Sequence, residues 1–218
     1  PHAPEISRGF DMLAHGRPIL AHPEKGSAAR GSMAVSRFDP SHSVKFDLGR
    51  GSVHLDGAGP RLLVPPDALI ELCKHAGDDS LTNFGRTLGT EVGLRITEHW
   101  GDGGQSIGVE GFVDHLGGNL ALLGFGSLSL ERWGKALVFV IEGSPLGAAG
   151  DPLLAAVLEG ALQRCMGRDG RAVVLGRDDA HVRFLVIGAP GADRARALLS
   201  QGKSWGEAIA RLHEGSAE

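Results

Sequence analysis

Tyrosine is absent from the 218 residues of this chain, and aromatic residues make up only 5% of it. Any ligand site must therefore rely on aliphatic side chains, phenylalanine or tryptophan, and chemistry that needs a phenol is excluded. Cysteine is scarce as well, since Cys73 and Cys165 are the only two. Both lie in apolar patterns typical of helices, which favours two buried thiols over a disulfide or a metal-binding pair.

The chain also lacks an excess of positive charge and any long apolar run. Its formal net charge is −4 at pH 7, whereas nucleic-acid binding requires a basic face. No apolar run reaches the length that spans a bilayer, and the first residues lack the charged-then-apolar pattern of a secretion signal. We therefore expect no nucleic-acid partner, no membrane span and a cytoplasmic location.

Glycine is present in excess, with 34 residues, about twice its usual share. A chain of this length buries roughly 70% of its surface on folding, and we expect one main domain over residues 42–189. The proline-interrupted residues 1–41 predict an N-terminal arm that lies on the domain or is exchanged with a partner subunit. Residues 190–218 predict a C-terminal helical tail.

The spacing of the apolar residues predicts an α+β domain in which an antiparallel sheet packs against a helical layer. The strand over 136–141 is apolar on both faces, so it should lie centrally in the sheet. In chain order, the expected elements are a hairpin over 44–55, a strand at Leu62–Val64, helices over 66–76, 80–100 and 109–123, strands over 128–130 and 136–141, a helix over 151–166, a hairpin over 172–187, and helices over 190–199 and 205–213.

Details of the helices can be predicted too. Leu69, Leu72 and Cys73 should lie on the buried stripe of the first helix. Asp78 or Asp79 should cap the second helix at its N-terminus. The last helix should dock through the apolar residues Trp205, Ile209 and Leu212, behind a capping box made by Ser204 and Glu207.

Three glycines stand at four-residue spacing in the predicted helix over 80–100, namely Gly85, Gly89 and Gly93. Each destabilises a helix by about 1 kcal/mol relative to alanine, so close approach of another group must offset this. The glycines favour packing against a helix of the same chain, a helix–helix seam in a homodimer, or a ligand against bare backbone. We take them as the candidate dimer interface.

Candidate catalytic residues are few. Ser106 lies in Gly104–Gly108, which matches the letters of a nucleophile elbow, but that elbow needs a buried strand before it. The preceding residues form a glycine-rich loop instead, expected to be mobile over Gly101–Gly108. An enzyme would use Ser106, His99 or His115 with Asp114, although no spacing in the sequence brings these groups within hydrogen-bond reach.

The sequence predicts no metal site and no cofactor. None of the ten histidines is paired at the spacing of helical metal ligands, and no pair of cysteines is separated by two residues. Asp178, Asp179 and His181 cluster at the last predicted hairpin turn. A solvated turn explains them, because aspartate favours turns, and a weak divalent-ion site is the alternative.

Four segments carry a resemblance to a known family. They are the glycine-punctuated Phe84–Gly89, the strand and turn Val138–Pro145, the helical Leu158–Leu162 and the closing strand Val182–Val186. With these segments, the region from about Phe46 to Ile187 resembles the 4-vinyl-reductase-like domains of bacteria and archaea, which are related in fold to small subunits of the TRAPP vesicle-tethering complex.

The resemblance implies an α+β fold, dimerisation through helices, and an apolar cavity between helices and sheet that binds hydrophobic or aromatic molecules. It also implies regulation of an attached output domain. Many members carry zinc-binding cysteines around the final hairpin, whereas Gly176–Phe184 contains none. A zinc site of the family type is therefore not expected here.

Together these observations predict a non-catalytic module that binds an apolar small molecule or a protein partner and forms a homodimer. A structural subunit using the 1–41 arm and a hydrolase using Ser106 with a histidine are the alternatives. The pocket should lie between helices and sheet, although the same residues would also suit a filled core. The candidate ligand-binding residues are Leu88, Val92, Phe112, Leu116, Leu158 and Cys165.

Overall fold

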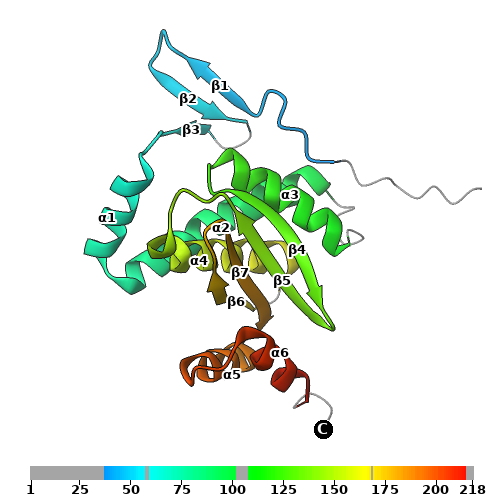
Figure 1. Ribbon diagram of the computed structural model, residues 1–218. Helices are drawn as coiled ribbons and strands as arrows, with labels where there is room; N and C mark the ends of the chain where they lie inside the picture. The colour runs from blue at the N-terminus through cyan, green and yellow to red at the C-terminus, as the bar shows by residue number, and fades with distance from the viewer. Residues whose placement is uncertain (1–36, 57–58, 102–107, 168, 215–218) are drawn as a thin grey trace, which may run out of the picture. The chain divides into compact units, whose positions relative to one another are not determined.

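The computed structural model describes residues 37–56, 59–101, 108–167 and 169–214 (Figure 1). These belong to one compact unit that begins at Val35. Most of the predicted arm, most of the predicted mobile loop and Ser106 lie outside the described residues. None of the described helices has the length and apolar character needed to cross a membrane.

A four-stranded antiparallel sheet forms the centre of the molecule. Its strands are β4 (Ser127–Trp133), β5 (Ala136–Glu142), β6 (Gly170–Arg177) and β7 (His181–Gly188), in the spatial order β4–β5–β7–β6. β5 therefore lies inside the sheet, between β4 and β7, and its middle residues are buried on both faces. This agrees with the prediction from its two apolar faces. The predicted α+β fold with an antiparallel sheet is confirmed.

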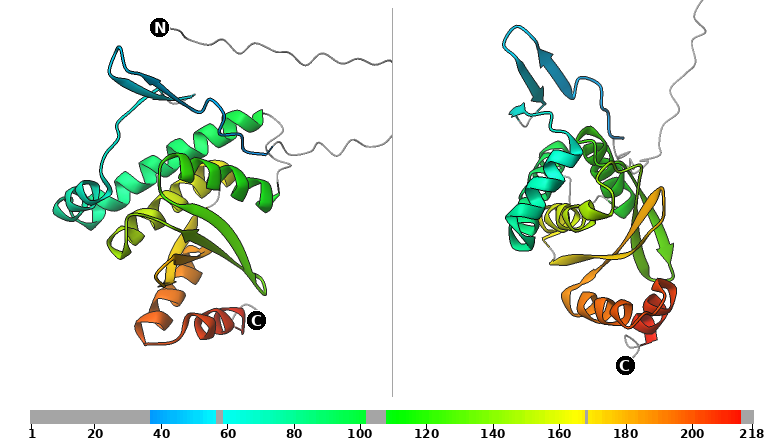
Figure 2. Two further views of the ribbon diagram at one scale, coloured as in Figure 1. Left: turned by 45° about the horizontal axis from the view of Figure 1, so that its top comes forward. Right: turned by 60° about the vertical axis from the view of Figure 1, so that its left-hand side comes forward.

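One face of this sheet is covered by two helices, α3 (Val109–Leu122) and α4 (Asp151–Met166), and α2 (Asp78–Trp100) packs on these two helices (Figure 2). A short 3₁₀ turn, η2 (Ala148–Gly150), leads into α4. The core between helices and sheet is made of large, fully buried side chains. Among them are Ile96, Phe112, Leu116, Leu120, Phe139, Leu158 and Phe184.

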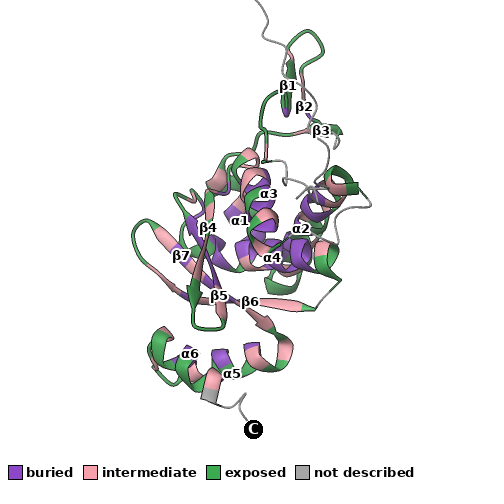
Figure 3. Cartoon of the chain, turned by 90° about the vertical axis from the view of Figure 1, so that its right-hand side faces the viewer, coloured by how far each residue is buried: buried purple, intermediate pink, exposed green. Residues whose placement is uncertain are grey.

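The other face of the sheet is covered by α5 (Ala189–Ser200) and α6 (Trp205–Glu214). Figure 3 shows buried residues on α5 and α6 as well as in the sheet and the large helices. Ile209 and Leu212 pack against Val138, Val140 and Leu185 in a second apolar cluster. The predicted docking of the last helix is therefore confirmed for these two residues, and the predicted tail forms a second helical layer.

A smaller antiparallel sheet precedes the helices, formed by β1 (Val44–Asp47), β2 (Ser52–Leu55) and β3 (Gly59–Arg61). The third strand was expected at Leu62–Val64, and this is wrong: its described residues lie outside any strand, and β3 ends at Arg61. Pro65 and Pro66, which follow, favour an extended chain, but proline has no backbone N–H to donate to a neighbouring strand.

Helix α1 (Pro66–Ala76) begins with the predicted proline, but its buried stripe differs from the prediction. Ile70 and Cys73 are buried, whereas Leu72 is 67% exposed. The predicted burial of Leu72 is wrong because α1 packs against α2 along a stripe rotated by one residue toward Ile70.

The predicted aspartate cap of α2 is also wrong, since Gly77 occupies the N-cap position and no side chain caps this described terminus.

The three spaced glycines of α2 face α4 of the same chain. A Cβ atom built on Gly89 would lie 2.0 Å from the backbone oxygen of Val157, and one on Gly85 would lie 2.6 Å from the Cβ of Ala156. From the opposite helix, a Cβ on Gly160 would lie 2.3 Å from the Arg86 oxygen. The assignment of Gly85, Gly89 and Gly93 to a dimer interface is therefore corrected: α4 occupies this face, and the alternative of packing within the chain holds.

Candidate functional site

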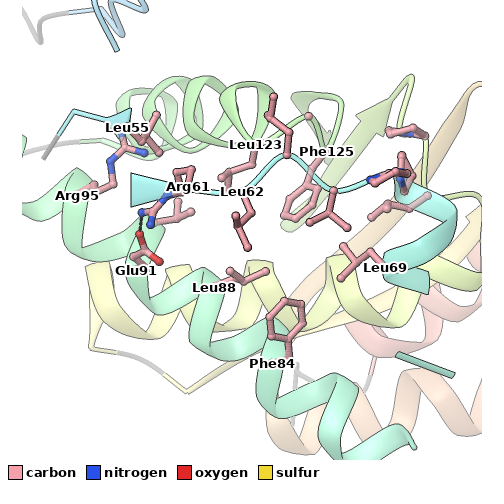
Figure 4. A pocket seen from close by; sticks show the side chains of 18 residues that line it. Leu55, Arg61, Leu62, Leu69, Phe84, Leu88, Glu91, Arg95, Leu123 and Phe125 are labelled. Atoms are coloured by element: carbon pink, nitrogen blue, oxygen red, sulfur yellow. Dashed lines mark hydrogen bonds and ion pairs between the residues drawn. The ribbon is translucent and has the colours of Figure 1, made fainter. Parts of the chain in front are cut away.

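An apolar pocket with a volume of about 510 Å³ opens beside helix α2. Its walls come from the extended segment 62–66, helix α1, one side of α2, and the turns that follow α3 and β5 (Figure 4). The volume lies in the range of small-molecule sites. The apolar lining comprises Leu55, Leu62, Leu63, Val64, Pro65, Pro66, Leu69, Phe84, Leu88, Val92, Leu123, Phe125, Pro145 and Leu146.

Helix α2 supplies the longest wall of the pocket. Phe84, Leu88 and Val92 recur every four residues, which places them on one side of the helix. Each of these residues is followed directly by a glycine, and the three glycines bring the adjacent side of α2 against α4. The helix therefore has one face for packing and a neighbouring face for the pocket. The sequence pattern that holds the helix in place therefore also orients the pocket wall.

The wall opposite α2 is formed by the segment Leu62–Val64, which was predicted to be a strand and lies outside any strand. Leu62 is 88% exposed, and Leu63 and Val64 are exposed as well, although all three line the pocket. In Figure 4 the side chain of Leu62 lies opposite Leu88, with Leu123 nearby. An apolar ligand between these walls would remove leucine surface from water on both sides, which favours binding by about 25 cal/mol per Å² buried.

One end of the pocket is polar. Arg61 pairs with Glu91, and Arg95 lies beside them near Leu55, whereas Leu69, Phe84 and Phe125 lie toward the other end (Figure 4). Among the described residues, none hydrogen-bonds to or forms an ion pair with the Arg95 guanidinium. Burial lowers the pKa of Arg95, as does the nearby positive charge of Arg61, while Asp56 and Glu98 raise it.

The structure divides the six predicted ligand-binding residues into two groups. Leu88 and Val92 line the pocket. Phe112, Leu116 and Leu158 lie in the packed core between helices and sheet. Cys165 packs beside that core and its thiol donates a hydrogen bond to the Gly93 oxygen at 3.4 Å.

The expected position between helices and sheet is filled by large side chains, and the described pocket lies beside α2, next to the face that packs against α4. Sequence reasoning missed the residues contributed by segment 62–66 and by the turns after α3 and β5. The one available signal was the run Leu62–Val64 ahead of two prolines, an apolar triplet that the small sheet cannot bury. The sequence did not indicate that Arg95 lines a pocket, because many arginines lie on helices without contacting a ligand.

The proposed hydrolase residues are partly outside the described chain. His99 and His115 lie with ring centroids 4.8 Å apart, and His115 is buried. Asp114 accepts a hydrogen bond from the Phe38 backbone amide at 2.9 Å. Since Ser106 lies outside the described residues, the structure does not test the catalytic alternative.

The acidic turn between β6 and β7 is held by internal hydrogen bonds. Asp178 accepts hydrogen bonds from the backbone amides of Ala180 at 3.0 Å and His181 at 2.7 Å, and from the side chain of Arg183 at 3.1 Å. These bonds hold the pKa of Asp178 far below its usual value. The interpretation as a hydrogen-bonded turn fits this geometry, and the described residues contain no cluster of three or more metal-ligating side chains.

Comparison with known proteins supports the fold. No protein-family model matches the chain, and no curated protein matches its sequence. A solved structure of the phenol-responsive sensory domain of the transcription activator PoxR, with phenol, is similar over 67% of this chain and 85% of that domain. The TM-score is 0.50 at 15% sequence identity, which shows a shared α+β fold.

Proposed function

We propose that this chain is a non-catalytic sensory module that binds an apolar small molecule in the pocket beside α2. The fold it shares with the phenol-responsive sensory domain of PoxR supports this function by analogy. The observation that carries the proposal is the pocket itself, which is large enough for a small molecule and almost entirely apolar apart from one charged end.

The location of the pocket also fits regulation. Its walls come from α2, which belongs to the packed core, and from segment 62–66, which is mostly exposed. A ligand that contacts both α2 and segment 62–66 would stabilise the position of this segment, and of the small sheet and α1 that it connects, against the core. Such a ligand changes the relative stability of the arrangements available to segment 62–66, which is how a binding event becomes a signal.

Binding can be tested with Nile red, a neutral dye whose fluorescence rises in apolar surroundings. We expect the full chain to bind the dye and Phe84→Glu to weaken binding at least about tenfold, because a carboxylate in the pocket opposes apolar burial. Equal binding by the two proteins would overturn the assignment of the dye to this pocket, and no binding by the wild type would overturn the proposed function.

Leu94→Glu is the matched control for this experiment. Leu94 stands on the same helix, is 38% exposed against 40% for Phe84, and does not line the pocket. The two variants therefore add the same charge to similarly exposed positions of α2. Leu94→Glu should bind Nile red like the wild type, and the thermal unfolding of both variants shows whether they fold.

Homodimer formation remains a proposal, with a different surface from the glycine seam. Phe46, which is 62% exposed, pairs with Val53 on one face of the small sheet, and Leu48 in the turn after β1 is 88% exposed. Exposed apolar patches of this kind are typical of interaction surfaces. We infer that a second copy of this chain covers that face.

A further inference from the structure

Arg95 differs from the other half-buried or buried charges near the pocket because it lacks a local partner. Arg61 pairs with Glu91, and on the other side of α2 Arg86 pairs with Glu159. In the part of the chain that the structure describes, the Arg95 guanidinium makes neither a hydrogen bond nor an ion pair, although it lines the pocket. A half-buried charge in this state gains from any anion that reaches it.

Two carboxylates attract Arg95 from a distance. Asp56 and Glu98 both favour its charged form, but Asp56 forms its ion pair with Lys45, and neither carboxylate hydrogen-bonds to or forms an ion pair with Arg95. Arg61 opposes them as a neighbouring positive charge. Since Glu91 pairs with Arg61, Arg95 is the charged group at this end of the pocket that can form an ion pair with an incoming anion.

The shape of the pocket indicates how the rest of the ligand extends. Its lining on α2 runs from Phe84 to Arg95, a stretch of roughly 16 Å at 1.5 Å per residue of helix. Leu62, Leu88 and Leu123 lie between the charged end and the end near Phe84 and Leu69 (Figure 4). A ligand that reaches Arg95 and fills this length has one anionic head and an extended apolar body.

We propose that the pocket binds an apolar carboxylic acid, with its carboxylate on the Arg95 guanidinium and its body between Leu62 and Leu88. The inference rests on the proposed function and adds the chemical class of the ligand. Arginine suits this role because its planar fork of N–H donors matches a carboxylate through two parallel hydrogen bonds. Aliphatic and aryl acids share this chemistry, so the experiment includes one of each.

The test compares acids with the matching alcohols by isothermal titration calorimetry. Octanoate and 1-octanol form the aliphatic pair, and 3-phenylpropanoate and 3-phenylpropan-1-ol form the aryl pair. We expect at least one acid to bind the wild-type chain more tightly than its alcohol. Arg95→Met should weaken binding of that acid about 10- to 100-fold, as expected for a hydrogen-bonded charge, and leave the alcohol unchanged.

Two further variants make the result specific. Arg95→Lys should retain part of the preference for the acid, because it keeps the charge but loses the fork. Arg194→Met removes an exposed arginine of α5 that does not line the pocket and should change nothing. Raising the salt concentration should weaken binding of the acid more than binding of the alcohol.

The outcomes separate the two proposals. If alcohols and Nile red bind but neither acid binds more tightly than its alcohol, the ligand class is wrong and the pocket function stands. The same holds if Arg95→Met weakens acid and alcohol equally. If Nile red does not bind the wild-type chain, the proposed function itself fails, and the ligand class fails with it.

Discussion

Carboxylates buried in helix α4 have arginine partners that join this helix to its neighbours. Glu159 accepts a hydrogen bond from Arg86 of α2 at 2.8 Å and another from the backbone amide of Ala172 in β6 at 3.2 Å. Asp151 pairs with Arg177 at the end of β6, with Nε at 3.1 Å from the carboxylate. Such pairs add little net stability but are damaging when one partner is removed, because a buried charge is left alone.

Both cysteines are free thiols, and burial raises the pKa of each. Cys73 is buried, as predicted, whereas Cys165 is only half-buried. Cys165 is affected more strongly, to a pKa of about 11 from an ordinary 9.0. The unfolded chain therefore releases this proton at lower pH than the folded chain does. Between these two pKa values the folded state holds more protons, so the contribution of Cys165 to stability falls as the pH rises through that window.

The raised pKa predicts slow alkylation of Cys165. In a Cys73→Ala variant, the rate with iodoacetamide at pH 8 should be about 100-fold lower in the folded protein than in urea, because only the thiolate reacts. The rate should keep rising up to about pH 11. Mass spectrometry measures it, and a rate that levels off near pH 9 in the folded protein would contradict the expected burial of the thiol.

His115 and Asn119 show where residue type misleads a reader of the sequence. Both are polar, yet both are buried on α3, and the Asn119 side chain donates a hydrogen bond to the His115 oxygen at 2.8 Å. The ring of Phe38 lies edge-on to His115 with centroids 6.0 Å apart. No periodicity argument places Phe38 there, because the contact joins residues far apart in the chain.

At the scale of elements, glycines on both helices allow the close approach of α2 and α4. Gly85, Gly89 and Gly93 allow α4 to approach the α2 backbone, and Gly160 does the same from the other side. The spacing of the glycines predicted that another helix or a ligand packs closely against this face of α2. It left the identity of that neighbour open, because an apolar helix of the same chain and one of a partner look alike in sequence.

This close packing predicts a large effect for Gly89→Ala. The added methyl group would meet the Val157 backbone oxygen at 2.0 Å, and backbone atoms cannot move aside as a flexible side chain does. We expect a loss of about 2 kcal/mol or more in the free energy of unfolding, despite the better helix propensity of alanine. Urea denaturation followed by circular dichroism measures this loss.

Gly206→Ala is the control, since no heavy atom lies within 4 Å of a Cβ built on this glycine of α6. It should leave the free energy of unfolding unchanged or raise it by up to about 1 kcal/mol. If Gly89→Ala behaves in the same way as this control, the two helices are packed less closely than the structure indicates.

At the scale of the whole molecule, the sheet has helices on both faces while the small sheet retains an exposed apolar face. Strand β5 illustrates the first point, because Val140 faces α5 and α6 whereas Phe139 and Ile141 face the larger helices. Phe46 illustrates the second, since it lies on the small sheet and remains mostly exposed. The proposed homodimer would cover this remaining surface.

We expect the wild-type chain to be a dimer by size-exclusion chromatography with light scattering, and Phe46→Ser to shift it toward monomer. Removing an exposed aromatic ring should cost the single chain little stability, since such effects arise mostly from buried groups. Lys45→Ser is the matched control, as Lys45 is the adjacent residue on the other face of β1. A monomeric wild type, or equal effects of both variants, would reject this interface.

Local pattern by itself determined the α+β class, the order of the helices and strands, the central place of β5 and the docking of Ile209 and Leu212. These follow from the periodicity of apolar residues and from turn signals, which act over a few neighbouring positions. The tertiary structure alone decided that α4 fills the glycine face of α2, that Phe112 and Leu158 belong to a filled core, and that the pocket opens beside Leu62. The physical reason is that apolar side chains at the same spacing serve equally well as core or as pocket lining, and only the arrangement of distant segments leaves space beside some of them.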